Sequence, residues 1–138
     1  MKKINMVDLN GQYRKIRWQV NREIKKVINT SSFVNGPIVK EFQNNLQEYL
    51  GVKHVIPCAN GTDALQIALM ALDLKIGDEV ITTNFSFAST IEVILLLGLK
   101  PVVIDIDPRT FNINPDLIQD KISNKTKAII PVHLFGQS

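Results

Sequence analysis

The 138-residue sequence has few of the features that would assign it to a class at once. Its one cysteine, Cys58, excludes a disulfide within the chain. Its longest apolar stretch, VILLLGL at residues 93–99, is far shorter than the roughly 18 residues of a membrane span. The basic start, MKKINMVDLN, lacks the apolar core of a secretory signal. We therefore expect a cytoplasmic protein with no membrane partner.

Common phosphate and metal motifs are missing too. There is no Gly-Lys-Ser/Thr of a Walker loop and no G-x-G-x-x-G of a dinucleotide site. The two histidines, His54 and His133, have no second His or Cys at ligand spacing, so we expect no metal site.

Charge is unevenly spread along the chain. Residues 1–57 carry ten Lys or Arg and four Asp or Glu, a net +6, whereas residues 58–138 carry six and nine, a net −3. A basic segment attracts nucleic acids and small anions, but the commoner cause is a solvated helix face. The basic residues also lack the interleaved aromatics of a single-strand binder, so no nucleic-acid partner is expected.

The first part of the chain has helical periodicity. Apolar residues recur at helical spacing between residues 12 and 28. They are Tyr13, Ile16, Val20, Ile24, Val27 and Ile28. Asn35-Gly36 predicts a turn, Pro37 suits the start of a second helix, and Gly51 its end. Residues 1–52 are therefore predicted to be an N-terminal helical extension.

Residues 53–138 alternate between short apolar runs and helical patterns. The runs lie at residues 54–58, 80–83, 101–106 and 128–134, and the helical patterns at 62–72, 88–98 and 113–122. Asn114 is a candidate cap for the last helix, with Pro115 at its first position. The runs are apolar throughout rather than alternating, as in strands buried on both faces. This order predicts an α/β domain with a mostly parallel sheet and helices on both faces.

Ligands of such sheets bind outside the carboxyl ends of the strands. Asn60-Gly61-Thr62 follows the first predicted strand and begins a helix. Free backbone N–H groups, a close approach at Gly61 and the Thr62 hydroxyl would suit a phosphate. Ordinary capping by Asn60 or Thr62 explains the same residues, and the pattern alone favours capping.

The other strand ends carry weaker signals. Phe85 and Phe87 have the same parity on an extended chain, so both could point the same way, and one could stack on a flat ligand or both could pack in the core. Asp105 and Asp107 are expected to cap turns. Cys58 is expected to be a small core residue in a strand.

Six stretches, in this order, resemble the DegT/DnrJ/StrS family of pyridoxal phosphate-dependent sugar aminotransferases. They are VDLNGQYRKI, FVNGPIVKEFQNNLQEYLGVKHVI, CANGTDALQIALMAL, GDEVITTNFSFAST, GLKPVVIDIDPRTFNI and KTKAIIPVHLFGQS. The resemblance covers nearly the whole chain. It implies the large domain of the aspartate aminotransferase (type I) fold, and a homodimer with active sites at the subunit interface.

The resemblance also implies roles for single residues. Gly61, Thr62 and Asp63 would bind the phosphate of pyridoxal 5′-phosphate, and Phe87 would stack on its ring. Gln137 would lie near the cofactor. A loop that borders the active site, and hence the substrate, would contain Phe33, Asn35 and Gly36.

The implied reaction moves an amino group, typically from glutamate, to a keto group of a nucleotide-linked sugar, for surface-polysaccharide or amino-sugar biosynthesis. The family's Schiff-base lysine and ring-nitrogen aspartate have no counterpart in this sequence and are expected beyond residue 138, so no catalytic residue is assigned. We therefore expect an N-terminal fragment with a truncated α/β domain, inactive and prone to association by itself. A sugar dehydratase homologue, a non-catalytic regulator of the same fold and an independent phosphate-binding module are the alternatives.

Overall fold

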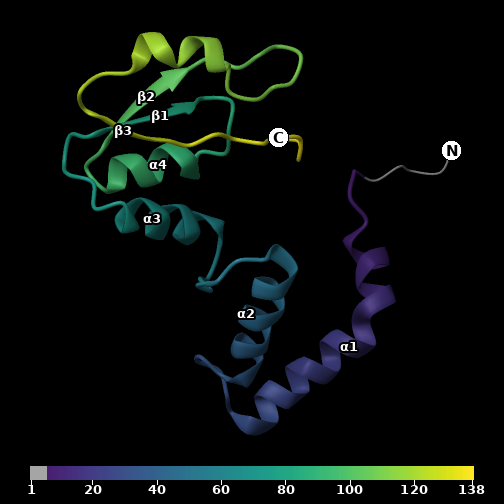
Figure 1. Cartoon of the computed structure of the whole chain (residues 1–138). Helices are drawn as coiled ribbons and strands as arrows, with labels where there is room; N and C mark the ends of the chain where they lie inside the picture. Colours follow the sequence, from purple (N-terminus) through teal and green to yellow (C-terminus); the bar gives the residue numbers. More distant parts are fainter. Residues whose placement is uncertain (1–5) are drawn as a thin grey trace, which may run out of the picture. The chain divides into compact units, whose positions relative to one another are not determined.

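The computed structural model describes residues 6–138, which form two compact units (Figure 1). Unit one comprises the described residues up to Pro57, and unit two is Cys58–Ser138. Each unit is described by itself below. Along the described residues, no helix combines the length and the apolar character needed to cross a bilayer.

Unit one contains helices α1 (Leu9–Thr30) and α2 (Pro37–Leu50). The Asp8 side chain caps α1 by accepting a hydrogen bond from the Gly11 N–H at 2.9 Å. Proline opens α2, and Gly51 closes it in the left-handed region (φ 66°), where glycine carries no Cβ penalty. The predicted helices, the turn before Pro37 and the stop at Gly51 are confirmed.

The segment after α2 does not form the strand predicted at residues 54–58. Its carbonyl groups bind side chains of α2 instead: the Gln47 amide donates to the Lys53 carbonyl at 2.6 Å, and the Gln43 amide donates to the Val55 carbonyl at 2.9 Å. A strand exists only through a ladder of backbone hydrogen bonds, and no described strand pairs with this segment. Cys58 is exposed, so its prediction as a core residue is also wrong.

Unit two is built on a parallel three-stranded sheet, rather than the four strands expected. The strands are β1 (Glu79–Thr83), β2 (Lys100–Ile104) and β3 (Thr126–Ile129), in the order β2-β1-β3. In the register, Ile81 faces Val102 of β2 and Ile129 of β3. The central strand β1 is buried along its whole length, as its apolar run predicts, whereas the outer strands are buried only in part.

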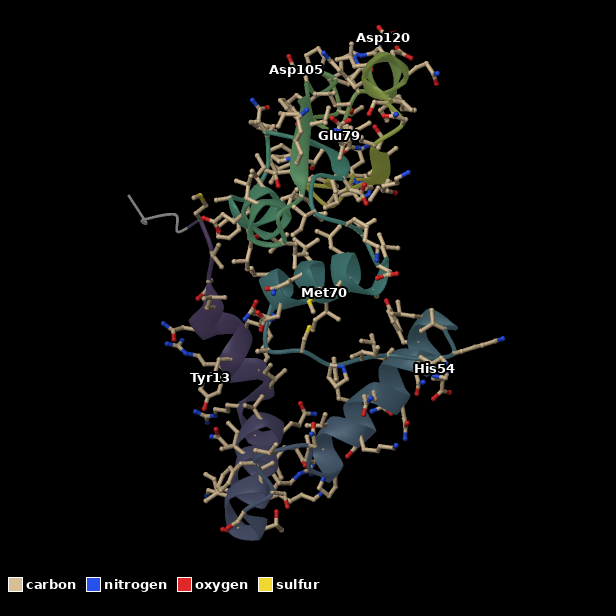
Figure 2. All side chains as sticks on the ribbon, turned by 90° about the vertical axis from the view of Figure 1, so that its left-hand side faces the viewer. Tyr13, His54, Met70, Glu79, Asp105 and Asp120 are labelled. Atoms are coloured by element: carbon tan, nitrogen blue, oxygen red, sulfur yellow. The ribbon has the colours of Figure 1, made fainter. Side chains whose placement is uncertain are left out.

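Helix α4 (Ser89–Leu96) packs on β1 and β2, and helix α3 (Gly61–Ala71) packs on α4. The buried core of these layers consists of Leu69, Val80, Val93, Ile94 and Leu99. Met70 projects from α3 on the side away from the sheet, as Figure 2 shows, and is largely exposed.

The helix predicted at residues 113–122 forms two short 3₁₀ turns, Pro115–Leu117 and Gln119–Lys121. Asn114 caps the first turn as predicted, accepting a hydrogen bond from the Asp116 N–H at 3.0 Å. The helix type was wrong because an α-helix this short depends on packing, and Ile122 remains half exposed. Figure 1 shows these turns on the side of the sheet away from α4, so helical segments flank both faces.

Candidate functional site

The candidate site lies at one edge of unit two. In Figure 1 the arrowheads of β1 and β2 and the first residues of α3 and α4 lie on the same side of this unit. This is the geometry expected for parallel strands with crossover helices, which collects strand carboxyl ends and helix N-termini at one edge. Four segments meet this description: the start of α3 and the loops that follow β1, β2 and β3.

The start of α3 combines a cap with free donors. The Asn60 side-chain oxygen accepts a hydrogen bond from the Asp63 N–H at 2.9 Å, and the Asn60 amide donates to the Asp63 carboxylate at 3.1 Å. The capping interpretation is therefore confirmed. Within residues 6–138, the N–H groups of Gly61 and Thr62 make no hydrogen bond. A Cβ at Gly61 would meet nothing within 4 Å, so this backbone is open to a ligand.

The loop after β1 gives Phe85 and Phe87 different surroundings, although their parity in the sequence predicted that both could point the same way. Phe87 is 74% exposed, whereas Phe85 is 39% exposed and packs against other rings. The Phe85 N–H donates to the Thr83 hydroxyl at 3.2 Å, and the Ser86 hydroxyl lies 2.8 Å from that of Thr90. These contacts bend the chain directly after β1, so the two-residue alternation of a strand no longer applies.

The loop after β2 is a tight turn organised by Asp107. One oxygen of its carboxylate accepts the N–H groups of Arg109 at 2.8 Å and Thr110 at 3.0 Å. These backbone hydrogen bonds, with a weaker one from the Arg109 side chain, hold the pKa of Asp107 below its ordinary value. Asp105 accepts the Ile106 N–H at 2.8 Å. Asp107 therefore caps a turn, as predicted, whereas Asp105 contacts only the next residue of an extended segment and caps none.

The loop after β3 holds His133 and Gln137. The Gly136 N–H donates to the His133 carbonyl at 3.0 Å, and the Nδ1 atom of His133 lies 3.2 Å from the Gln137 carbonyl. The Gln137 side chain is exposed at the same edge. Its role toward a cofactor stays a prediction.

Three further predicted site residues lie in unit one. Phe33, Asn35 and Gly36 belong to the connection between α1 and α2, where Phe33 is exposed and Gly36 is buried. Their substrate role stays a prediction.

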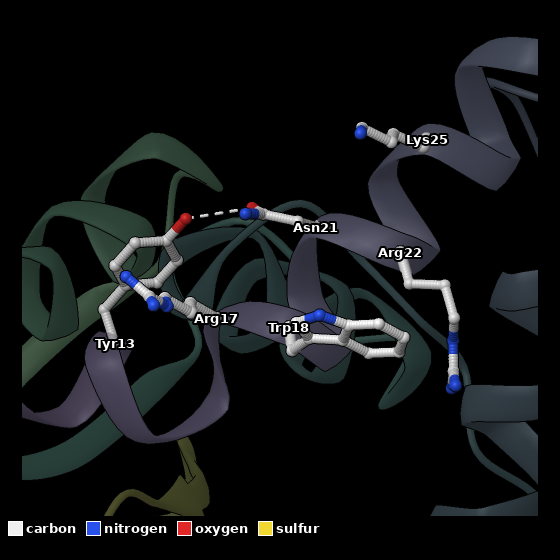
Figure 3. Close-up of a pocket in the computed structure, with 6 residues that line it drawn as sticks. All are labelled: Tyr13, Arg17, Trp18, Asn21, Arg22 and Lys25. Atoms are coloured by element: carbon white, nitrogen blue, oxygen red, sulfur yellow. Dashed lines mark hydrogen bonds between the residues drawn. The ribbon is translucent and has the colours of Figure 1, made fainter.

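Unit one also presents a basic and aromatic face on α1, shown in Figure 3. Its residues are Tyr13, Arg17, Trp18, Asn21, Arg22 and Lys25. The Tyr13 hydroxyl donates to the Asn21 side chain at 2.9 Å. Tyr13 and Trp18 thus lie among the basic side chains of this face, contrary to the expectation that the basic residues lack interleaved aromatics, because the helical repeat brings them together. All of these residues belong to α1.

A polar cluster that the sequence did not predict lies at the opposite, amino end of the strands. Glu79 is 8% exposed, and its carboxylate accepts hydrogen bonds from the Ser123 hydroxyl at 2.6 Å and the Lys100 ammonium at 3.0 Å. These two partners lower the pKa of Glu79. Glu79 lies within unit two in Figure 2. The cluster ties β1 to β2 and to the segment before β3, which is a structural role.

Comparison with known proteins identifies the family. A model of the DegT/DnrJ/EryC1/StrS aminotransferase family matches residues 14–138. The UDP-2-acetamido-2-deoxy-3-oxo-D-glucuronate aminotransferase of Pseudomonas aeruginosa is 47% identical over 97% of this chain and 37% of its own length. The "Pleiotropic regulatory protein" of Geobacillus stearothermophilus is 46% identical over 97% of this chain and 36% of its own.

Solved structures agree with the sequence relatives. The crystal structure of NtdA from Bacillus subtilis, with bound cofactor PMP, superposes with a TM-score of 0.88. The match is 37% identical and covers 99% of this chain and 32% of that one. The chain thus spans about a third of the length of these relatives, and it has the fold of the corresponding part of a pyridoxal phosphate-dependent aminotransferase. By its matching segments and by its fold, the chain belongs to the DegT/DnrJ/EryC1/StrS aminotransferase family.

Proposed function

We propose that this chain supplies the phosphate-binding and ring-stacking elements of a pyridoxal phosphate-dependent sugar aminotransferase. The enzyme would transfer an amino group from glutamate to a keto group of a nucleotide-linked sugar, in surface-polysaccharide or amino-sugar biosynthesis. The observation that carries the proposal is the open start of α3, on the same edge of unit two as the loop bearing Phe87, in a member of this family.

The residues at this edge fit the two ends of the cofactor. The N–H groups of Gly61 and Thr62 are free among the described residues, and the positive end of the α3 dipole favours a phosphate there. The Thr62 hydroxyl adds a donor. Asp63 is engaged by the Asn60 cap, so its contribution to phosphate binding stays a prediction. The exposed ring of Phe87 offers a flat face to an aromatic ligand.

The residues of this chain would bind and orient the cofactor rather than move protons. When bound, pyridoxal 5′-phosphate supplies the electron sink for the reaction. The N–H groups at the start of α3 would hold its phosphate, and Phe87 would shield one ring face from water. Lys100 is paired with Glu79 at the opposite end of the strands, so it is not placed to act at this edge. The absence of a Schiff-base lysine from this chain stays a prediction.

The names of the relatives support a proposal for the substrate class. The Pseudomonas relative acts, by its name, on a UDP-linked 3-keto-hexuronate derivative. We propose a sugar of this class for the present protein, with dTDP- and GDP-linked keto-sugars as the nearest competitors. We also propose that the whole protein is a homodimer and that it works in the cytoplasm.

Replacement of Gly61 by alanine tests the phosphate site. The added Cβ meets no protein atom within 4 Å, so the melting temperature should not fall, but it would occupy space that the phosphate needs. We expect pyridoxal 5′-phosphate to bind about tenfold or more weakly, a loss of at least about 1.4 kcal/mol. Pyridoxal, which lacks the phosphate, should bind as it does to the unchanged protein. The measurement is a spectroscopic titration with both ligands.

Thr62 provides a matched pair of controls. Thr62→Ser keeps the hydroxyl and should retain affinity, whereas Thr62→Val keeps the shape, loses the hydroxyl and should weaken phosphate-dependent binding. Equal affinities of Gly61→Ala, Thr62→Val and the unchanged protein for pyridoxal 5′-phosphate would remove the phosphate site from the proposal.

A regulatory role is the second candidate, because the Geobacillus relative is named a regulatory protein. The two candidates differ in turnover. Glutamate-dependent amino transfer to a nucleotide-linked keto-sugar supports the enzyme, whereas cofactor binding without turnover by the whole protein supports the regulator.

A further inference from the structure

Three phenylalanines from three different strand-end loops form one aromatic cluster in unit two. Phe85 follows β1, Phe111 follows β2 and Phe135 follows β3. The Phe85 and Phe111 rings stack with centroids 5.7 Å apart, and the Phe111 and Phe135 rings meet edge to face at 5.5 Å. The third pair, Phe85 and Phe135, is 6.4 Å apart. All three pairs lie in the distance range of favourable aromatic contacts.

The cluster is a surface feature of the candidate edge rather than part of the core. Phe85 and Phe111 are about two-fifths exposed and Phe135 is 68% exposed, whereas the core residues below them are almost fully buried. Hydrophobic burial alone does not explain why three loops bring large rings to this edge.

Phe111 is held in an unusual backbone conformation. Its φ is 61°, in the left-handed region that non-glycine residues rarely adopt. The Asp107 turn imposes it: the Phe111 N–H donates to the Asp107 carbonyl at 2.8 Å, and the Asp107 N–H donates to the Asn112 carbonyl at 2.9 Å. Such a conformation persists only when its surroundings determine it, and it is commonest at functional sites.

The two rings that Phe111 contacts belong to the loops that carry predicted cofactor residues. Phe85 precedes Phe87 by two residues, and Phe135 precedes Gln137 by two residues. Each ring is part of a short bent segment, bound locally by the Thr83 hydroxyl and by the His133 carbonyl respectively. A change in the position of Phe111 would therefore be transmitted to both loops.

We propose that Phe111 is a positioning residue: its ring, contacting Phe85 and Phe135 together, sets the placement of Phe87 and Gln137 around the ring end of the cofactor. The inference deepens the proposed function and rests on it. Phe111 itself has no contact with the reacting atoms in this assignment. It acts through the two loops.

The test separates the ring from the backbone of Phe111. Phe111→Gly suits the left-handed φ and removes the whole side chain, whereas Phe111→Tyr keeps an aromatic ring. Hydrogen exchange of the full chain, without cofactor, reports on the Phe85 and Gly136 N–H groups, which lie in the two loops. We expect both to exchange about tenfold faster in Phe111→Gly and at the original rate in Phe111→Tyr. The Asp63 N–H, bonded within the α3 cap, should not change.

Ligand binding provides the second measurement. Phe111→Gly should lower the affinity for pyridoxal 5′-phosphate about tenfold and leave the affinity for inorganic phosphate unchanged. The phosphate would bind at the start of α3, which does not depend on the aromatic cluster. A general loss of structure would weaken both ligands. If Phe111→Gly does not melt cooperatively, Phe135→Ala removes the most exposed ring of the cluster and should still speed exchange at Phe85.

The inference would be overturned if the Phe85 and Gly136 N–H groups exchanged at their original rates in Phe111→Gly. It would also be overturned if the Phe85 N–H exchanged at its original rate in Phe135→Ala. The proposed function fails separately. If the unchanged protein binds neither pyridoxal 5′-phosphate nor phosphate while both loops loosen in Phe111→Gly, the coupling of the loops stands and the cofactor assignment falls.

Discussion

The two units bury their apolar residues to very different degrees. In unit one, neither α1 nor α2 has a buried residue, and Ile16, Ile24 and Ile28 on the predicted apolar face of α1 are all exposed. In unit two, β1 is wholly buried and α4 contributes Val93 and Ile94 to the core. Helical periodicity correctly predicted α1 and α2 in unit one and α3 and α4 in unit two, but not the 3₁₀ turns at residues 115–121. Periodicity thus predicts a helix and its apolar face, but not what covers that face.

Alanine substitution of one isoleucine in each unit gives the largest expected contrast. Ile94 and Ile24 both lie within α-helices, so their intrinsic helix propensities cancel in the comparison. Ile94→Ala should lower the free energy of unfolding of unit two by about 2–5 kcal/mol, because it leaves a cavity in a packed core. Ile24→Ala, at a half-exposed position, should cost less than about 1 kcal/mol. Urea unfolding followed by circular dichroism measures both.

Equal losses for Ile94→Ala and Ile24→Ala would contradict the contrast. They would mean that the apolar face of α1 is covered in solution, for instance by association of the chain. Sedimentation velocity over a range of concentrations would then show whether copies of the chain associate.

The helix caps give an intermediate effect. Asn60 caps α3 and Asp8 caps α1, each by accepting a backbone N–H three residues on at 2.9 Å. Asn60→Ala should destabilise unit two by about 1 kcal/mol. Asp8→Ala should fray α1 without changing the unfolding of unit two, because α1 adds nothing to that core. Amide exchange along α1 and the melting temperature of unit two distinguish the two effects. A fall in that melting temperature in Asp8→Ala would show that the units unfold together.

Glu79→Gln should have the smallest effect, and one that depends on pH. Hydrogen bonds from Ser123 and Lys100 lower the pKa of Glu79 in the folded chain from its ordinary value of 4.5. A lowered pKa means that the carboxylate stabilises the fold above about pH 4.5, and that this stabilisation is lost as the pH falls through the folded value. The variant should therefore unfold at lower urea than the unchanged chain near neutral pH, and the gap should close as the pH falls through the lowered pKa of the folded chain.

Glu48→Gln, an exposed carboxylate of α2, is the matched control and should show little gap at either pH. A Glu79→Gln gap that stays constant with pH would show that the charge of Glu79 is not what stabilises unit two.

Local signals predicted much of the fold. The spacing of Ile16, Val20 and Ile24 predicted α1, Pro37 and Gly51 predicted the limits of α2, and the apolar run at residues 80–83 predicted β1. These features depend on residues close together in the chain. The run at residues 54–58 failed because a strand needs a partner elsewhere in the chain, and a sequence pattern does not name that partner.

The candidate site was predicted unevenly for the same reason. The start of α3 follows from Asn60-Gly61-Thr62 alone, since a cap and its free amides are local. The different surroundings of Phe85 and Phe87 did not follow from their parity, because the bend after Thr83 decides them. Phe111 and Phe135 gave no signal, because they meet only after three strands have been brought into register.

By itself, then, the sequence determined helices α1 to α4, the parallel α/β class of unit two, the capped turn at Gly61 and, through its resemblance, the family. These depend on periodicity, on backbone chemistry and on motif order, all of which are written in neighbouring residues. Only the tertiary structure decided which apolar faces are buried, that Glu79 is held by Lys100 and Ser123, and that three rings join at the strand ends. Those outcomes require contacts between segments distant in the chain, and their free energy exists only once the sheet has formed.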